Sequence, residues 1–339
     1  MSKKKELLYC YQEKGICKYE YPMINGLNQY IQIRGADRSN PLLLFLHGGP
    51  GGSMAGLCHV LQAEWEKHFT VVNWDQRNTC KTFLANKKNM AEIAKTGSIS
   101  DYTADIDAVI KYLHTVYTFD KIILMGFSWG SLIGSAYAKS HPENVSCYIG
   151  VGQQVDYFEA LELSCNQIRE LAKGSAEDTA KIDAFMKMAS KKPQMDAAFM
   201  KELISFSELG TKYIARDGAP FPVKALMSSP FLKFREKKTM IRTDYTLFEG
   251  TYKTLTSYNF RSNLHFDVPV LFISGDEDFV CPNRMIADCF DEISAPKKKN
   301  VVIPKATHTC FLDKPEEFLQ TVLDFCSCEN QGRENQGRF

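Results

Sequence analysis

The segment Gly126-Phe127-Ser128-Trp129-Gly130 places a serine between two glycines, a spacing that supports nucleophilic chemistry. A serine hydroxyl is a weak nucleophile until a neighbouring base removes its proton. In a G-x-S-x-G elbow the serine occupies a strained turn between a strand and a helix, and the glycines stand where the two backbones pass too closely for side chains. By chance the bare pattern occurs in about one chain in ten of this size. Here a strand-like apolar run at 121–125 precedes it and a helical run at 132–139 follows, so we predict that Ser128 is the nucleophile.

Of the seven histidines in the chain, His141, His265 and His308 follow Ser128, and His141 lies just after the helical run that the serine precedes. Hydrolases built around this elbow carry an acid and then a histidine after the serine, on loops at the carboxyl ends of strands. His308 follows an apolar run at 300–303, whereas His265 precedes such a run, where a surface histidine is the usual explanation. We therefore predict that His308 is the general base. His47 precedes the nucleophile and is expected to be structural.

An acidic residue is needed to orient the imidazole of the base. Asp276, Glu277 and Asp278 all lie in the loop after the apolar run 268–274. Each of them also fits a solvated turn, and spacing alone does not choose among the three.

Two N–H groups are needed beside the serine to stabilise the oxyanion that develops in the transition state. The residue after the nucleophile supplies one, which here is Trp129. The second is expected from the Gly-rich segment 47–52 (HGGPGG), and within it we favour Gly49. A phosphate-binding loop is the alternative for such glycines, but the Gly-Lys-Ser/Thr sequence that such a loop requires does not follow them.

Short apolar runs alternate with helical patterns along the chain. Residues 27–34 alternate like an early strand, and the apolar runs cover 42–46, 69–74, 121–125, 147–151, 268–274 and 300–303. Fully apolar runs of this length predict a mostly parallel central sheet with helices on both faces. Together with the elbow, the pattern predicts an α/β protein with the α/β-hydrolase fold.

A long interval without a convincing strand interrupts this alternation. It contains helical stretches, and we predict that it forms a cap over the carboxyl ends of the strands, where ligands bind in such sheets. The tail is polar and contains ENQGR twice, which predicts disorder. The predicted parts are a first core segment at 1–151, the helical cap at 152–265, a second core segment at 266–328 and the disordered tail at 329–339.

The composition excludes several classes of partner. The 339 residues carry a formal net charge of +1, so no extended basic surface for nucleic acid or an anionic membrane is expected. No signal peptide is predicted, and no apolar run is long enough to span a bilayer. The 11 cysteines lack framework or zinc spacing, which predicts reduced thiols in a cytoplasmic protein without a metal or cofactor. The sequence leaves the oligomeric state open.

These motifs resemble those of the prolyl iminopeptidase family of α/β-hydrolases. The matching segments are HGGPGG, WDQR, GFSWGS and GDEDFVCP, followed by a late histidine, and they cover roughly residues 25–150 and 265–325. The resemblance implies that Asp278 is the acid of the triad. It also implies an oxyanion hole made by the HGGP loop and Trp129.

The chain departs from the family pattern after WDQR. The family usually continues with a Gly-rich segment, whereas this chain has Asn-Thr-Cys-Lys-Thr at 78–82, so we expect a loop of different shape. Asparagine adopts a left-handed conformation more readily than cysteine does. Within the motif, Asp75 and Arg77 are expected to form a structural ion pair or to anchor a loop.

The resemblance implies an aminopeptidase that releases an N-terminal residue, such as proline, from a short peptide. Members of the family hold the substrate's free amine with acidic cap residues, often near tryptophans, and this chain has no tryptophan after Trp129. The candidate anions are Glu162, Glu208, Asp244 and Glu249. One alternative is an esterase or amidase for a small uncharged substrate, which requires only an apolar cap. Another is a non-enzymatic binding protein, against which the intact serine, histidine and aspartate argue.

Overall fold

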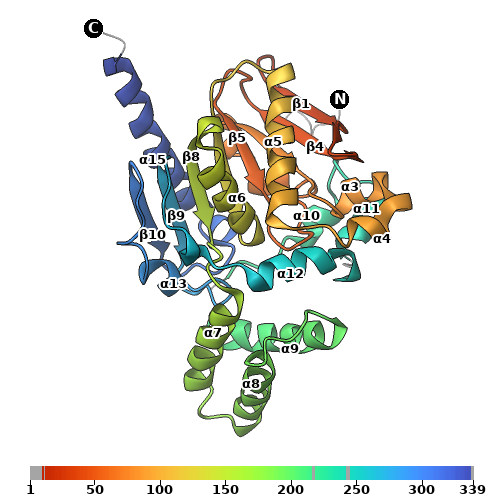
Figure 1. The fold of residues 1–339 in the computed structure, drawn as a ribbon, viewed down its shortest axis with the longest axis vertical. Helices are drawn as coiled ribbons and strands as arrows, with labels where there is room; N and C mark the ends of the chain where they lie inside the picture. The colour runs from red at the N-terminus through yellow and green to blue at the C-terminus, as the bar shows by residue number, and fades with distance from the viewer. Residues whose placement is uncertain (1–9, 11, 216–217, 242–244, 337–339) are drawn as a thin grey trace.

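A mostly parallel sheet of eight strands forms the centre of the computed structural model, which describes residues 10, 12–215, 218–241 and 245–336 (Figure 1). The strand order is β1-β4-β6-β5-β7-β8-β9-β10, and β4 runs antiparallel to both of its neighbours while all other neighbouring pairs are parallel. The strands are β1 (Ile16–Glu20), β4 (Ile31–Gly35), β5 (Leu42–Leu46), β6 (Thr70–Trp74), β7 (Ile122–Phe127), β8 (Val145–Val151), β9 (Val270–Gly275) and β10 (Lys298–Ile303). The predicted parallel sheet is confirmed.

The early strand predicted at 27–34 is divided in the structure. Its first part is β3 (Leu27–Asn28), which pairs with β2 (Met23–Ile24) in a separate small sheet, and its second part is β4. The chain leaves the strand pattern in between because the N–H of Tyr30 donates to the hydroxyl of Thr82 at 2.8 Å.

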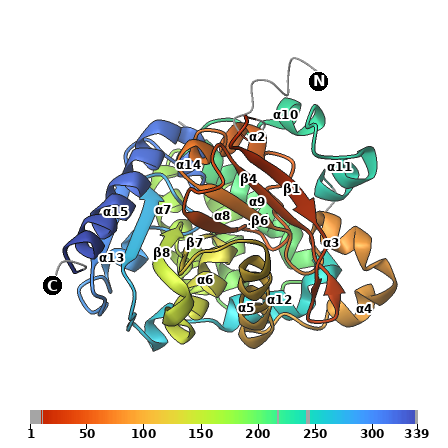
Figure 2. The same cartoon turned by 90° about the horizontal axis from the view of Figure 1, so that it is seen from above.

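Helices cover both faces of the sheet (Figure 2). The helices α5 (Ile99–Val116) and α6 (Trp129–Ser140) pack on one face. The other face is covered by α2 (Cys58–Leu61), α14 (Cys310–Asp313) and α15 (Pro315–Gln336). Apolar residues at helical spacing explain α5, which buries Ile106, Val109, Ile110 and Leu113.

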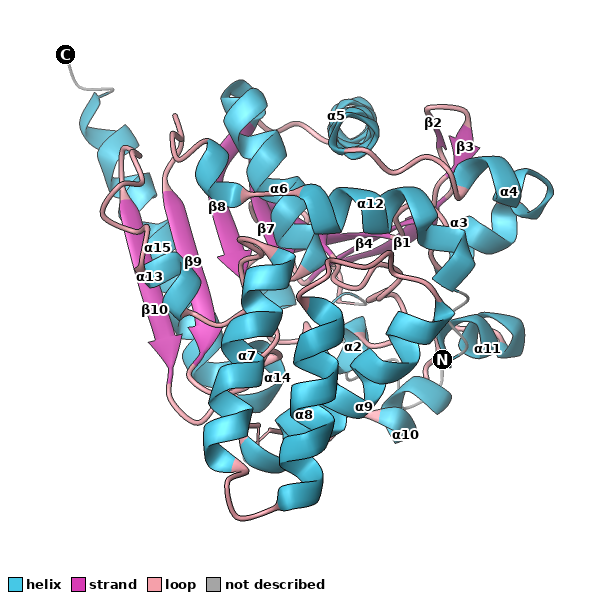
Figure 3. Ribbon diagram, turned by 60° about the horizontal axis from the view of Figure 1, so that its bottom comes forward, coloured by secondary structure: helices cyan, strands magenta, loops and turns pink. Residues whose placement is uncertain are grey.

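The described residues between β8 and β9 form helices and no named strand. Figures 1 and 3 show the first three of these helices as a group on the side toward which the arrowheads of β8 and β9 point. The α-helices of this interval are α7 (Tyr157–Leu171), α8 (Ala176–Ala189), α9 (Ala197–Tyr213), α10 (Val223–Met227), α11 (Phe234–Ile241) and α12 (Glu249–Ser257), and η5 (Tyr245–Phe248) and η6 (Phe260–Ser262) are 3-10 turns.

The group of α7, α8 and α9 has its own start signals and its own small core. The side chains of Asp156, Ser175 and Asp196 each accept a hydrogen bond from a backbone N–H in the first turn of the helix that follows. Inside the group, Phe185 stacks on Phe206 with ring centroids 4.4 Å apart. These helices are therefore held together by apolar contacts largely separate from those under the sheet.

Short elements complete the chain, and they connect the strands. They are α3 (Cys80–Ala85), α4 (Met90–Ile93), α13 (Arg284–Ala287), η2 (Trp65–Lys67), η3 (Lys87–Asn89) and η4 (Pro142–Asn144). No helix among the described residues is long and apolar enough to cross a bilayer.

The polar tail differs from the prediction of disorder at 329–339. The last helix, α15, continues to Gln336, and residues 337–339 lie outside the described part of the chain. Glu, Gln and Arg are good helix formers, and adding residues to an existing helix costs far less than nucleating a new one.

The connection between β7 and α6 is the tightest crossing in the core. A Cβ on Gly130 would overlap the carbonyl oxygen of Leu46, and one on Gly126 would overlap the carbonyl oxygen of Gly130. The helix backbone therefore lies directly against the ends of β5 and β7, as the spacing of the two glycines predicts.

We expect Gly130→Ala to destabilise the fold by about 3 kcal/mol or more, because a methyl group has no space between α6 and the end of β5. Urea unfolding followed by circular dichroism measures this loss. Gly174→Ala is the matched control, since a Cβ there meets no atom within 4 Å, and its effect should stay within about 0.5 kcal/mol. Equal stabilities of the two variants would contradict the close approach.

Candidate active site

Ser128 occupies a strained turn at the carboxyl end of β7. Its φ of 54° and ψ of −119° lie in a region that residues with side chains rarely adopt. Its N–H donates to the carbonyl oxygen of Val151 at 2.9 Å, and its carbonyl oxygen accepts from the N–H of Ser131 at 2.8 Å. The side chain is half-buried. These bonds to β8 and α6 hold a conformation that costs about 1–3 kcal/mol in isolation.

His308 and Asp278 form a hydrogen-bonded pair on the loops after β10 and β9. The Nδ1 of His308 lies 2.8 Å from Oδ2 of Asp278, and the other carboxylate oxygen accepts from the N–H groups of Val280 and Cys281 at 2.9 and 2.8 Å. The Asp278 side chain is fully buried and that of His308 is 17% exposed. A carboxylate can only accept here, so the proton is on Nδ1 and Nε2 is the basic nitrogen.

The imidazole of His308 is held beside the serine elbow by two neighbours. The ring of Phe127, which precedes the serine, lies 4.9 Å from it between centroids. A Cβ on Gly152 would lie 2.9 Å from Cε1 and 3.0 Å from Nδ1 of the imidazole, so the backbone after β8 packs against that edge of the ring. A Cβ on Gly48 would lie 3.1 Å from Cβ of Ser128. Loops from five neighbouring strand ends therefore meet at one place.

The other two carboxylates of the β9 loop have structural contacts. Asp276 is exposed, and its Oδ1 accepts from the N–H of Ala306 at 3.2 Å. The N–H of Glu277 donates to the carbonyl oxygen of Ala306 at 2.9 Å. Both bonds fix the β9 loop against the loop that carries His308, and Asp278 is the carboxylate that contacts the imidazole.

A buried hydrogen-bond network fixes the HGGPGG loop to the elbow. The indole N–H of Trp129 donates to the side-chain oxygen of Gln76 at 2.9 Å, and the amide nitrogen of Gln76 donates to the carbonyl oxygen of His47 at 3.1 Å. Gly49 follows this anchor with a φ of 119° and an exposed backbone. Gln76 is a positioning residue that the sequence reasoning missed, although the WDQR motif that contains it was recognised.

His47 belongs to the same network and is structural, as predicted. Its Nδ1 lies 2.8 Å from the carbonyl oxygen of Gly48, and its Nε2 accepts from the backbone N–H of Gln76 at 3.2 Å. Burial lowers the pKa of His47 to about 4, so the ring is neutral near pH 7 and keeps this donor and acceptor arrangement.

Asp75 and Arg77 bond to different partners instead of to each other. Asp75 accepts from the hydroxyl of Ser53 at 2.5 Å and from the N–H of Lys81 at 3.0 Å. Arg77 forms a two-bond ion pair with Asp105 of α5, at 2.5 and 2.9 Å. Of the two roles expected for Asp75 and Arg77, an ion pair or a loop anchor, the contacts of both residues fit the loop anchor.

The loop after WDQR contains two left-handed residues, Asn78 with a φ of 58° and Cys80 with a φ of 35°. The conformation expected of the asparagine therefore also occurs at the cysteine. In the family pattern, glycines would adopt it without strain.

A mostly apolar cleft of about 290 Å³ lies between the HGGPGG loop and the helices after β8. The core contributes Gly49, Pro50, Phe279 and Val280 to it. The helices contribute Tyr157, Leu161, Met195, Met200, Leu203, Phe206, Ser207, Tyr252 and Leu255. None of these lining residues carries a charge, so the described walls of the cleft suit an uncharged group.

None of the described acidic candidates for amine binding lines this cleft. Glu162 and Glu208 are exposed, and each follows a residue that does line it, Leu161 and Ser207 respectively. Both side chains are therefore on the solvent-exposed surface of their helices and outside the lining of the cleft.

Glu249 does not line the cleft either. Glu249 is exposed and pairs with Lys253 at 2.8 Å, a bond that lowers the pKa of its carboxyl. Asp244 lies outside the described residues. Among the described residues, no group of three or more His, Cys, Asp or Glu side chains is arranged to hold a metal ion.

Comparison with known proteins assigns the family. Residues 41–315 match the family model of the alpha/beta hydrolase fold. The chain belongs to the α/β-hydrolase fold family. It is 27% identical to the probable aminopeptidase YbaC of Bacillus subtilis over 319 residues, which cover 92% of this chain and 96% of that protein.

Two further likenesses concern proline iminopeptidases. The enzyme of Neisseria gonorrhoeae is 32% identical over 125 residues, 37% of this chain and 36% of that protein. The crystal structure of proline iminopeptidase from Mycobacterium smegmatis superposes with a TM-score of 0.65 at 19% identity, covering 94% of this chain and 99% of that one. The predicted fold and the resemblance to the prolyl iminopeptidase family are both confirmed.

The buried carboxyl of Asp75 should make stability depend on pH. Burial raises its pKa to about 6 from an unperturbed 3.8, so its contribution to folding is present below pH 3.8 and is lost as the pH rises through 6. In Asp75→Asn this loss is absent. We take the free energy of unfolding at pH 7 and subtract the value at pH 4. This difference should be about 2 kcal/mol more positive in Asp75→Asn than in wild type.

Urea unfolding of both proteins at pH 4 and pH 7 measures this difference. The bond from the N–H of Lys81 favours the ionised carboxylate, and its effect is already contained in the raised pKa of about 6. Identical pH dependence of the two proteins would contradict a raised pKa at Asp75.

Proposed function

We propose that this protein is a serine hydrolase that acts by acyl transfer through Ser128, His308 and Asp278. The observation that carries the proposal is the His308–Asp278 hydrogen bond of 2.8 Å beside a serine in a strained strand-to-helix turn. That arrangement gives the imidazole a fixed tautomer with Nε2 as its basic nitrogen, which a serine nucleophile requires.

In the proposed reaction, the hydroxyl oxygen of Ser128 attacks a substrate carbonyl while Nε2 of His308 takes the hydroxyl proton. The oxyanion accepts hydrogen bonds from the N–H groups of Gly49 and Trp129. His308 then gives the proton to the leaving group as the carbonyl bond to that group breaks. Water attacks the acyl-enzyme by the same route, and the acid product and the free serine result.

Within this class we propose an aminopeptidase of the prolyl iminopeptidase type that releases N-terminal residues from short peptides. The likeness to the probable aminopeptidase YbaC over nearly the whole chain supports this choice. The cleft supports it as well, because a volume of about 290 Å³ with mostly apolar walls suits one small side chain such as a pyrrolidine ring.

A carboxylesterase or amidase for a small uncharged substrate is the second candidate. The observation that favours it is the absence of any carboxylate among the described residues that line the cleft. A protonated amine buried there would find only hydroxyl and carbonyl oxygens as partners, and an isolated buried charge is costly.

We expect Ser128→Ala to abolish covalent labelling by a fluorophosphonate and to lower kcat by about 10⁴-fold or more, because the nucleophilic oxygen is removed. Far-UV circular dichroism should stay unchanged. Ser140→Ala, at the exposed end of the same helix, is the control that should keep full labelling. Labelling that persists in Ser128→Ala would show that another residue is the nucleophile.

Three substrates separate the two candidates. An aminopeptidase should hydrolyse an unblocked prolyl anilide at least about 100-fold faster than its N-acetylated form, since losing a required ionic contact costs about 3 kcal/mol. An esterase should instead turn over a short-chain nitrophenyl ester without regard to a free amine. Ester turnover together with equal rates on the two anilides would refute the aminopeptidase proposal.

A further inference from the structure

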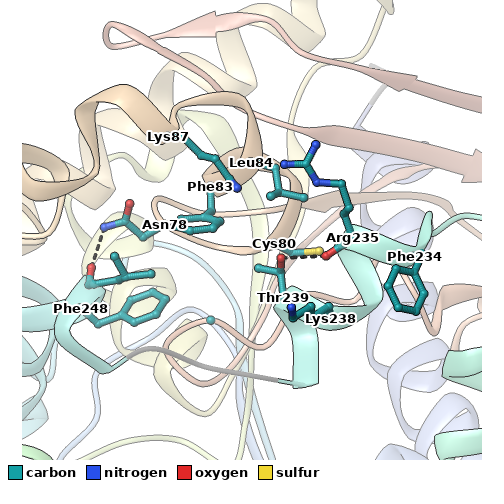
Figure 4. A pocket seen from close by; sticks show the side chains of 12 residues that line it. Asn78, Cys80, Phe83, Leu84, Lys87, Phe234, Arg235, Lys238, Thr239 and Phe248 are labelled. Atoms are coloured by element: carbon teal, nitrogen blue, oxygen red, sulfur yellow. Dashed lines mark hydrogen bonds between the residues drawn. The ribbon is translucent and has the colours of Figure 1, made fainter.

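A second cavity borders the HGGPGG loop two residues beyond Gly49. It has a volume of about 440 Å³ and touches the loop at Gly51. Its other walls come from residues 78–87 after β6, from residues 234–239 of α11 and from residues 247–248 of η5 (Figure 4). The proposed acyl-transfer chemistry leaves this cavity without a role.

The described lining of this cavity is positively charged. Lys87, Arg235 and Lys238 all line it, and none of its described lining residues is acidic. Within the described part of the chain, none of the three forms an ion pair with a carboxylate. Figure 4 shows the side chains of Lys87 and Arg235 extending toward each other from opposite walls.

The acidic residue Glu236 lies near this cavity but already has other partners. Glu236 lies on α11 between two of the cations, but its Oε2 pairs with Lys81 at 3.3 Å and accepts from the N–H of Lys233 at 2.6 Å. Like charges that share a hollow repel one another, and a concave wall focuses their field. An anion bound between them would remove that repulsion.

The remaining walls favour an anion that is part of a larger molecule. Phe83, Phe234 and Phe248 line the cavity, and Phe234 is 77% exposed. The side chain of Asn78 donates to the carbonyl oxygen of Leu247 at 2.6 Å, and its Oδ1 has no hydrogen-bond partner among the described residues. That oxygen is itself buried from solvent. The cations beside apolar surface match an anionic group that is carried on a larger, partly apolar molecule, such as the end of a peptide.

We propose that this cavity binds the C-terminal carboxylate of a short peptide whose scissile carbonyl lies at Ser128. The inference rests on the proposed peptidase function and names its substrate class as short peptides with a free carboxyl end. The carboxylate stays ionised and no bond to it changes.

The distances along the loop allow this placement. A Cβ on Gly48 would lie 3.1 Å from Cβ of Ser128, and the three residues from there to Gly51 span at most about 10 Å. A leaving group of two or three residues extends about 7–10 Å at 3.3–3.6 Å per residue. A tripeptide or tetrapeptide therefore has the length to join the two sites.

Matched peptides test the proposal. The value of kcat/KM for Pro-Gly-Gly with a free carboxyl end should exceed that for its C-terminal amide about tenfold, as two or three partly exposed ion pairs would give. This ratio should fall toward one in Lys87→Gln and Lys238→Gln and at high salt. Lys88→Gln is the control, since it removes the same charge from the adjacent position, which does not line the cavity.

A binding measurement separates this inference from the proposed function. Calorimetry compares Gly-Gly with its C-terminal amide on Ser128→Ala, which needs no turnover. Tighter binding of Gly-Gly than of its amide, with a smaller difference when Lys238→Gln is added, supports the anion site even if no peptide is hydrolysed. In that case only the proposed peptidase function fails. No preference for the acid, or the same preference in every variant, overturns the anion site whatever the peptidase assay gives.

Discussion

The close approach of α6 to the ends of β5 and β7 is the constraint on which the site depends. Gly126 and Gly130 stand where the backbones touch, so the chain must turn within the residues between them. That turn gives Ser128 its positive φ of 54° directly before Trp129, the first residue of α6. Any side chain at Gly130 would displace the helix and, with it, both the hydroxyl and one proposed oxyanion donor.

Buried hydrogen bonds give the remaining groups their positions. Asp278 accepts from two backbone N–H groups and from His308, which leaves its carboxylate little freedom. Gln76 connects the loop before Gly49 to the indole beside the elbow. Because buried polar groups are costly without partners, such networks select one arrangement of the loops. The geometry of the proposed triad is therefore preorganised by these bonds, and the hydroxyl of Ser164 on α7 adds a further bond to the carbonyl oxygen of Phe279 beside Asp278.

Those helices decide what can bind. They supply apolar and hydroxyl groups to the cleft, and α11 supplies Arg235 and Lys238 to the second cavity, which touches the HGGPGG loop at Gly51. One short loop thus touches an uncharged hollow at Gly49 and a positively charged hollow at Gly51. A substrate with an apolar acyl part and an anionic leaving end matches this division of charge better than a uniformly apolar ester does.

The sequence by itself determined the parallel sheet and the serine elbow, because apolar runs and paired glycines report local backbone constraints directly. It also predicted His308, in the loop after the last strand, as the base. Spacing alone did not choose among Asp276, Glu277 and Asp278, and the family resemblance implied Asp278; only the tertiary structure shows that Asp278 is the one that contacts the imidazole. It likewise showed that Glu162 and Glu208 are exposed and do not line the cleft, which depends on how the helices pack, and it revealed Gln76, whose partners lie 29 and 53 positions away in the chain.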